Sequence, residues 1–344
     1  MSKPTSVKPP LWSAPDRYME LMDSPWGKVL VTVQDAVSFA TAQFWAAQGV
    51  PTLHLPVTTG AVSSPLGLGS DSQPVRVDMF GQPTYLADSM QFSLEYGCRL
   101  SDSGCYYLMP SFRGEDPDAS HLCQFFHSEA ELPGGLDTTM SVVEDYLRHL
   151  TRHLLITCAD TIRDIAGTVT HLEGIADHDG PFERITFSEA VHLLAGDPEL
   201  IRTGTAPGSA PWRTVTRAAE QKLLTLCGSP VWVTNYDHLA VPFYQAYADD
   251  SRRTALNADL LLGVGEVVGA GERHTTAAEV RDALELHHIS EKPYEWYVEM
   301  REHRPLHTSG FGMGVERLLM WALDHDDIRD LQILVRRNGE NCTP

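Results

Sequence analysis

Apolar residues recur every three or four positions along two stretches of the chain, and this spacing predicts two long helices. The first covers residues 33–48 and ends at Gly49, a residue type that favours helix C-termini. The second covers residues 137–164 and is amphipathic, with Asp137 or Thr138 as its expected N-cap. Its apolar face consists of Met140, Val143, Leu147, Leu150, Leu154, Cys158 and Ile162.

Strands are predicted where short apolar or alternating runs lie between turn-forming residues. Residues 75–80 and 84–87 alternate around Gly81, which predicts a hairpin. A short strand at residues 51–56 should end at its proline, and a strand–helix unit is expected at residues 182–194. Further buried strands are expected at residues 106–112, 231–236 and 257–262 and around Glu266.

Other segments carry turn and loop residues. Residues 57–73 and 196–211 are rich in Gly, Pro, Ser and Thr, which predicts loops, and we expect the second to be mobile. Between them, Asp88 or Ser89 should cap a helix that turns Phe92 toward the core. The N-terminus is rich in Pro and Ser, so we expect residues 1–24 to form a flexible tail before one folded domain, residues 25–344.

Composition places the chain among globular proteins. Its 344 residues are 42% hydrophobic, enough for a sizeable core. No window of about twenty apolar residues and no signal-peptide pattern is present, so we expect a soluble, cytoplasmic protein without a membrane partner. The six cysteines lack metal-ligand spacing, and we expect reduced thiols without disulfides or zinc.

The charge balance bears on the choice of partner. Twenty-six Lys and Arg residues against 46 Asp and Glu residues give a formal net charge of −20. A tRNA-binding surface must neutralise phosphates with cations. The acidic balance therefore argues against tRNA as a partner.

Alternating glycines mark the stretch Gly310–Arg317, which is followed by an apolar run that predicts a buried helix. Without Cβ atoms, a strand of this kind can lie flat against a ligand. Arg317 falls in the first turn of the predicted helix, where it would face a phosphate. The glycine spacing differs from the G-x-G-x-x-G dinucleotide fingerprint.

This stretch resembles the third signature motif of class II aminoacyl-tRNA synthetases. Residues 112–115 and 121–131 are similar to the second motif of the aspartyl/asparaginyl branch, and residues 265–273 resemble its Glu-then-Gly-Gly-x-x-Arg segment. The resemblance implies an α+β fold, an antiparallel sheet flanked by helices. It also implies a homodimer formed through the helix–strand–proline unit at residues 33–56. The chain has no room for the branch's anticodon-binding barrel, so residues 25–344 should form a single catalytic domain.

The resemblance also implies ATP and Mg²⁺ as cofactors and assigns residues to them. Arg113 would bridge the α-phosphate and the attacking carboxylate, because its planar fork can hold two oxyanions. Glu266 and Arg317 complete the expected catalytic set, with Arg317 at the γ-phosphate. Glu131 and Glu266 would supply oxygen ligands for Mg²⁺. The other expected ATP-binding residues are Glu115 and Phe125 at the adenine, His121 near the phosphates, and Gly314.

The expected amino-acid site follows from the same likeness. Arg273 is spaced like the arginine that reads the distal carboxylate or carboxamide of the substrate. Leu94 occupies a position where aspartate-using relatives usually have lysine, so plain aspartate is disfavoured. The remaining expected substrate-binding residues are Ser89, Gln91, Glu129 and Asn235.

Three functions are compatible with these residues. The favoured one is an AMP-forming ligase that adenylates an aspartate- or asparagine-like acid and transfers it to ammonia or a small amine without tRNA. A protein with this function would resemble the archaeal asparagine synthetase-related proteins, which lack the anticodon domain. The alternatives are a stand-alone aspartyl- or asparaginyl-tRNA ligase and a non-catalytic regulatory paralogue.

Overall fold

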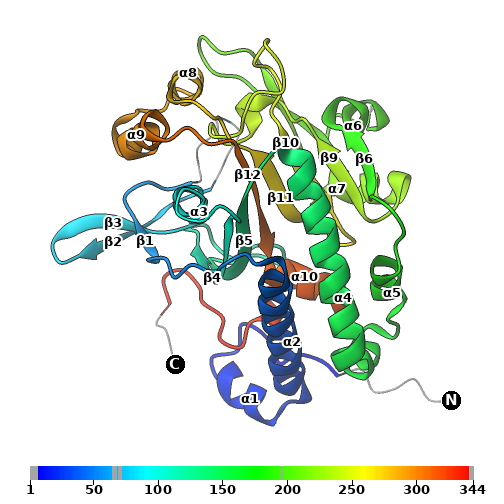
Figure 1. The fold of residues 1–344 in the computed structure, drawn as a ribbon. Helices are drawn as coiled ribbons and strands as arrows, with labels where there is room; N and C mark the ends of the chain where they lie inside the picture. Colours follow the sequence, from blue (N-terminus) through cyan, green and yellow to red (C-terminus); the bar gives the residue numbers. More distant parts are fainter. Residues whose placement is uncertain (1–6, 64–67, 69–71, 195–196, 341–344) are drawn as a thin grey trace.

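A seven-stranded sheet forms the centre of the molecule in this computed structural model, which describes residues 7–340 except 64–67, 69–71 and 195–196 (Figure 1). Neighbouring strands are antiparallel except for β6 and β9, which form a parallel pair at one edge. The expected α+β architecture with an antiparallel sheet is confirmed. In spatial order the strands are β4 (Cys105–Phe112), β5 (Gln124–Pro133), β12 (Thr308–Gly314), β11 (Glu266–Glu272), β10 (Asn257–Leu261), β9 (Val231–Thr234) and β6 (Glu183–Thr186).

The two faces of this sheet have different chemistry because side chains alternate along each strand. In β5, Ala130 and Leu132 join the main hydrophobic core, whereas Glu129 and Glu131 face the opposite side. In β12, Phe311 and Met313 likewise enter the core, and the alternating Gly310 and Gly312 lie on the face that carries the carboxylates. One face of the sheet therefore packs against helices and the other carries polar groups.

Two long helices cover the apolar face, where they lie side by side (Figure 1). α2 (Pro25–Gln48) starts at Ser24, whose side chain accepts from the amide of Trp26, and ends at Gly49 with a φ of 68°. α4 (Leu136–Ala166) is amphipathic as predicted, but Gly135 is its N-cap, so neither Asp137 nor Thr138 caps it. The shorter helices α5 (Thr170–Ala176) and α10 (Val315–Ala322) complete this layer.

Smaller elements surround the polar face. The predicted hairpin is β2 (Val75–Met79) and β3 (Gln82–Leu86), which projects from the body beside the two-residue strand β1 (Thr58–Thr59) (Figure 1). α3 (Gln91–Gly97) buries Phe92 as expected, but Met90 is its N-cap, because Asp88 is engaged by Ser63. The other elements are α6 (Phe187–Leu193), β7 (Ile201–Gly204), β8 (Trp212–Val215), α7 (Arg217–Cys227), η1 (His238–Ala240), α8 (Ala277–Leu286), η2 (Lys292–Tyr294), α9 (Glu295–His303) and η3 (Ile328–Leu331).

Two segments differ from their expected conformation. Residues 51–56 do not form a strand, and only Thr52 bridges to Tyr106 of β4. The stretch predicted as a mobile loop contains β7, which pairs with β8 to bury Trp212. Tertiary packing decides both cases, since short segments have little intrinsic preference of their own.

The N-terminal tail is more ordered than its composition predicts. Residues 1–6 lie outside the described part, but α1 (Arg17–Asp23) is helical, which corrects the expected tail boundary at residue 24. Arg17 is 5% exposed and donates to the backbone carbonyls of Pro10, Asp330 and Gln332. This arginine therefore holds the N-terminal segment against the C-terminal segment.

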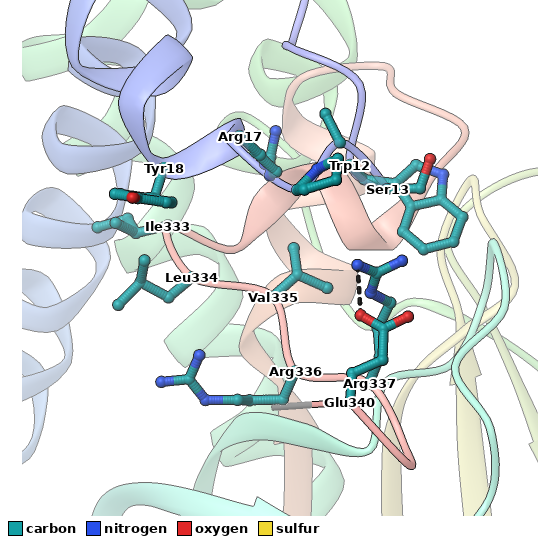
Figure 2. A pocket seen from close by; sticks show the side chains of 12 residues that line it. Trp12, Ser13, Arg17, Tyr18, Ile333, Leu334, Val335, Arg336, Arg337 and Glu340 are labelled. Carbon is teal, nitrogen blue, oxygen red and sulfur yellow. Dashed lines mark ion pairs between the residues drawn. The ribbon is translucent and has the colours of Figure 1, made fainter. Parts of the chain in front are cut away.

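A cavity of about 470 Å³ separates the two terminal segments. Figure 2 shows Trp12 and Ser13 on one side of it and the stretch from Ile333 to Glu340 on the other, with Arg337 paired to Glu340. The guanidinium of Arg329 lies 3.8 Å from the Trp12 ring centroid. Cation–π contact thus adds to the junction between the termini.

The outer edge of β4 is covered at both ends. The amide of Tyr106 donates to the carbonyl of Pro51, and its carbonyl accepts from Leu53. At the other end the amide of Phe112 donates to Ala87, and Pro110 lies between them. No helix in the described part of the chain is long and apolar enough to cross a membrane.

Candidate active site

One cavity on the polar face collects the residues expected to bind ATP, except Glu115. Arg113 follows β4, Phe125 lies on β5, Glu266 begins β11 and Arg317 lies in the first turn of α10, and all four line it. His121, Gly312 and Gly314 line it as well. Segments about 200 residues apart in the sequence therefore meet, because β5, β12 and β11 are adjacent strands.

Arg113, which lines this cavity, and Glu115, which does not, each have unused hydrogen-bonding capacity. The Arg113 guanidinium lies 5.5 Å from the Phe125 ring centroid. Nε of Arg113 and Oε2 of Glu115 are buried without a hydrogen-bond partner among the described residues. Buried polar atoms are normally paired. The Arg113 atom fits a site that a polar ligand completes.

Arg317 is fixed from the side of β11. Its Nη1 donates to the backbone carbonyl of Glu266 at 2.8 Å and lies 3.6 Å from the Glu266 carboxylate oxygen Oε2. Both side chains are partly exposed, at 27% and 38%. The guanidinium thus retains N–H groups for an incoming anion.

Two carboxylates converge beside Arg317. Asp259 of β10 pairs in register with Gly269 of β11. A Cβ on Gly269 would lie 3.2 Å from Oε1 of Glu266 and 3.7 Å from Oδ1 of Asp259. Burial, together with the negative charge of Glu266, raises the pKa of Asp259 well above its usual value. Hard carboxylate oxygens at one point suit Mg²⁺, which binds through one or two carboxylates plus substrate phosphates.

Asp259 was missing from the sequence-based site, and Glu131 does not belong beside Glu266. Glu131 of β5 pairs with Gly310 of β12, which pairs with Gly271 of β11. Gly271 is five residues from Glu266 along β11, a separation of roughly 17 Å along the strand direction. The two glutamates cannot share one ion. In the described part of the chain no three His, Cys, Asp or Glu side chains form a metal-binding group.

Glu129 forms a second polar centre, on β5. Its Oε2 accepts from Ser89 Oγ at 2.6 Å and from the Tyr107 hydroxyl, and its Oε1 lies 3.1 Å from His127 Nδ1. Burial alone would raise the pKa of Glu129, but the His127 charge and these hydrogen bonds outweigh it and lower the pKa. Glu129 is therefore an ionised carboxylate suited to an ammonium group.

Arg273 lies further along the same face and is 3% exposed. Its Nη2 donates to Oε2 of Glu131 at 2.9 Å and its Nε to both oxygens of that carboxylate. Nη1 donates to Oε1 of Gln245 at 3.2 Å. Burial raises the pKa of Glu131, and the charge of the adjacent Arg273 opposes this rise. Nearby, Nε2 of Gln91 is buried without a partner among the described residues.

The alternating glycines of β12 make room for these side chains. A Cβ on Gly312 would lie 2.8 Å from Oε1 of Glu129, and one on Gly310 would overlap Oε2 of Glu131 and approach Nη2 of Arg273 at 2.9 Å. The sequence predicted that the glycines admit a ligand. In the structure they admit the buried ion pairs that line its site.

Comparison with known proteins bears on these motifs and on the fold. A family model described as tRNA synthetases class II (D, K and N) matches residues 13–338. The chain belongs to this family.

Relatives of this class II synthetase include the asparagine–tRNA ligase of Protochlamydia amoebophila, 29% identical over 331 residues that cover 90% of the chain and 69% of the relative. The cytoplasmic asparagine–tRNA ligase 1 of Arabidopsis thaliana is 30% identical over 76% of the chain and 47% of its own length. The asparaginyl-tRNA synthetase of Pyrococcus horikoshii, solved with asparaginyl-adenylate, has a TM-score of 0.84 at 23% identity and covers 96% of the chain and 74% of its own. The chain spans about two thirds of the length of such bacterial relatives.

These comparisons correct the expectation about tRNA. The acidic balance argued against tRNA as a partner, but the relatives of this class II synthetase are named asparagine–tRNA ligases. That expectation is wrong, because net charge sums over the whole surface and does not describe the local field at one binding site. The acidic charge balance was the main argument for a ligase that acts without tRNA, so that hypothesis is not supported.

Three expected site residues of the synthetase lie elsewhere or have other partners. Leu94 packs in a buried apolar cluster with Met90 and Tyr107, and the next residue, Glu95, is the one that faces Arg273, at 4.0 Å. Asn235 has a φ of 60° and donates from its side chain to the carbonyl of Ala255. His121 is half exposed and paired with Asp118. For Leu94, the sequence predicted the position of α3 but not the rotation of this helix about its axis, which turns Glu95 and not Leu94 toward Arg273.

The synthetase also holds three buried histidines near Arg273. His238, His274 and His287 are at most 2% exposed. Burial lowers the pKa of His238 to about 4 and of His274 and His287 to about 3. All three are neutral at pH 7, and ordinary unfolded histidines take up protons near pH 6.5.

Acid should therefore weaken the synthetase through these histidines. Below pH 6.5 these histidines bind protons in the unfolded chain, whereas in the folded chain they bind them only near pH 3–4. The free energy of unfolding therefore decreases as the pH falls through this window. In His287→Gln, which does not titrate, this decline should be shallower than in wild type by up to about 1.4 kcal/mol per pH unit. Urea unfolding at pH 7.5, 6.0 and 5.0 measures it, and a difference between the two proteins that is constant with pH would contradict the assignment.

Proposed function

We propose that this protein activates asparagine with ATP and transfers it to tRNA, as an asparaginyl-tRNA synthetase-type ligase. The observation that carries this proposal is the environment of Arg273. Glu131 already neutralises the arginine, and the completely buried Glu95 lies 4.0 Å from it. A substrate with a second carboxylate would add uncompensated negative charge at this point, whereas a neutral carboxamide would not.

The reaction requires a carboxylate to attack the α-phosphorus of ATP and release pyrophosphate. Arg113 provides the fixed cation between the two anions, with its unpaired Nε available for one of them. Arg317 would hold the far end of the triphosphate, and Phe125 would stack on the adenine. Asp259 and Glu266 would hold Mg²⁺, which supplies charge neutralisation at the phosphates.

Orientation of the amino acid comes from two groups on the same face. The ionised Glu129, with Ser89 bound to it, would take the α-ammonium group, and Arg273 would take the carboxamide oxygen. Holding both ends leaves the α-carboxylate free to face Arg113. The names of the relatives support tRNA as the acceptor.

Two assays test this function in sequence. ATP–pyrophosphate exchange with asparagine or aspartate reports adenylation, and hydroxylamine traps the activated carboxyl as a hydroxamate. Transfer of labelled asparagine to tRNA then tests the acceptor. We expect exchange with asparagine above aspartate, followed by tRNA charging. Conversion of aspartate and ammonia to asparagine without RNA, or no exchange with any amino acid, would overturn the proposal.

We further propose a homodimer. Phe126, Ile333 and Leu334 are 40–44% exposed and line a cavity of about 540 Å³ beside α2, the predicted dimer helix. Exposed apolar side chains gathered at one place are typical of protein–protein contacts. Sedimentation equilibrium should give twice the monomer mass of 38.1 kDa. The Phe126→Glu variant should give a mass closer to that of the monomer.

A further inference from the structure

Gln245 is the second side chain that fixes Arg273, and none of the sequence motifs includes it. It is 9% exposed, and its Oε1 accepts from Nη1 of Arg273 at 3.2 Å. The backbones of the two residues form an isolated antiparallel bridge. A Cβ on Gly271 would overlap the Gln245 carboxamide, so β11 leaves space for this side chain.

Two neutral histidines hold the backbone of Gln245 from behind. Nε2 of His238 lies 2.8 Å from the Gln245 carbonyl oxygen, so this nitrogen carries the proton and donates. Nδ1 of His238 is then an acceptor, and Nε2 of His287 donates to it at 2.9 Å. Nδ1 of His287 is left as a lone pair, and it is buried without a partner in the described structure. The chain of donors therefore runs in one direction, from the end of α8 to Gln245.

The contact with Gln245 limits what Arg273 can still bind. A guanidinium has five N–H groups. Nε, Nη2 and Nη1 each use one of them, on Glu131 and Gln245. The two remaining N–H groups, one on Nη1 and one on Nη2, are those left for a substrate. Because Gln245 is a neutral acceptor, it occupies an N–H without removing more of the arginine's charge.

We propose that Gln245 is a specificity-positioning residue that makes Arg273 selective for a carboxamide over a carboxylate, and that His238 and His287 hold it in place. This inference rests on the proposed activation of asparagine. When Gln245 occupies Nη1, a carboxylate finds fewer N–H groups for its second oxygen, whereas a carboxamide needs only one acceptor contact. The neutral glutamine also keeps the local charge balance that admits an uncharged group.

Substitutions at Gln245 should shift selectivity in opposite directions. Gln245→Met frees one N–H of Arg273, which a second carboxylate oxygen can take, so the inhibition constant of aspartate relative to the KM of asparagine should fall about tenfold. Gln245→Glu adds a carboxylate beside Arg273, so the same ratio should rise. Asparagine-dependent pyrophosphate exchange, measured with and without aspartate as inhibitor, gives this ratio for each variant of the complete protein.

The histidines provide the positioning arm of the test. His287→Phe removes the donor to His238 and should raise the KM for asparagine with little change in kcat, whereas His287→Gln keeps an N–H and should remain near wild type. Gln82→Met, in the hairpin away from Arg273, is the matched control and should change nothing. A ratio that moves equally in both Gln245 variants, or not at all, would overturn the inference while exchange with asparagine persists. Absence of exchange in wild type would instead overturn the proposed function.

Discussion

Replacing Arg113 with alanine should lower the rate of adenylate formation by about a thousandfold, the upper range for loss of one preorganised charge-stabilising group. The reason is geometric. Arg113 lines the cavity proposed to bind ATP, and its Nε is buried without a hydrogen-bond partner among the described residues. Its guanidinium lies over the Phe125 ring. Fold stability should change by no more than about 1 kcal/mol, because the losses are one cation–π contact with Phe125 and a through-space attraction to Asp88.

Single-turnover formation of the asparaginyl hydroxamate measures this rate, and urea unfolding measures the stability. Arg252→Ala is a matched control, since the Arg252 guanidinium lies 5.6 Å from the Tyr247 ring on an exposed loop. It should retain adenylation near wild type. An Arg113→Ala protein that forms adenylate normally would remove Arg113 from the proposed chemistry.

Arg301→Met should cost about 3–5 kcal/mol of unfolding free energy, the range for breaking a buried ion pair. Arg301 is 1% exposed and pairs with the completely buried Glu95, which also accepts from Tyr297. Its Nε donates to the carbonyl of His274 at 2.7 Å. Methionine fills a similar volume but leaves Glu95 charged and short of a partner in the core.

A surface arginine provides the comparison for this loss. Arg281 pairs with Glu291 and Glu302, and all three side chains are 39–50% exposed. Arg281→Met should leave the unfolding free energy close to the wild-type value, because solvent screens exposed pairs. Urea unfolding of both variants at pH 7.5 gives the two values. Equal losses would mean that the Glu95 pair contributes no more than an exposed one.

The strands of the polar face could be predicted well from the sequence, because their chemistry lies in local patterns. The glycine alternation in β12 predicted a strand whose one face lacks Cβ atoms, and α10 begins directly after it. Residues 112–131 predicted that Arg113 and Phe125 come together, and β4 and β5 place both on one cavity.

What the sequence did not predict depends on register between distant strands and on helix rotation. Asp259 joins Glu266 only because β10 and β11 pair with Asp259 opposite Gly269. Glu131 is two residues from Glu129 on one strand, yet its partner is Arg273. Leu94 and Glu95 are adjacent, and the packing of α3 decides which one meets the arginine. Single-sequence periodicity contains no information on these long-range alignments.

The outer edge of β4 bears on how the protein behaves at high concentration. Exposed sheet edges are templates onto which further strands can add, the first step of ordered aggregation. Here Tyr106 and Phe112 already have backbone partners, and Pro110 has no amide to offer. In the described structure this leaves Leu108 as the outward-facing amide between them. The β4 edge is therefore closed to strand addition, and two copies that meet at this side would join through side chains and not through a continuous ribbon of strands.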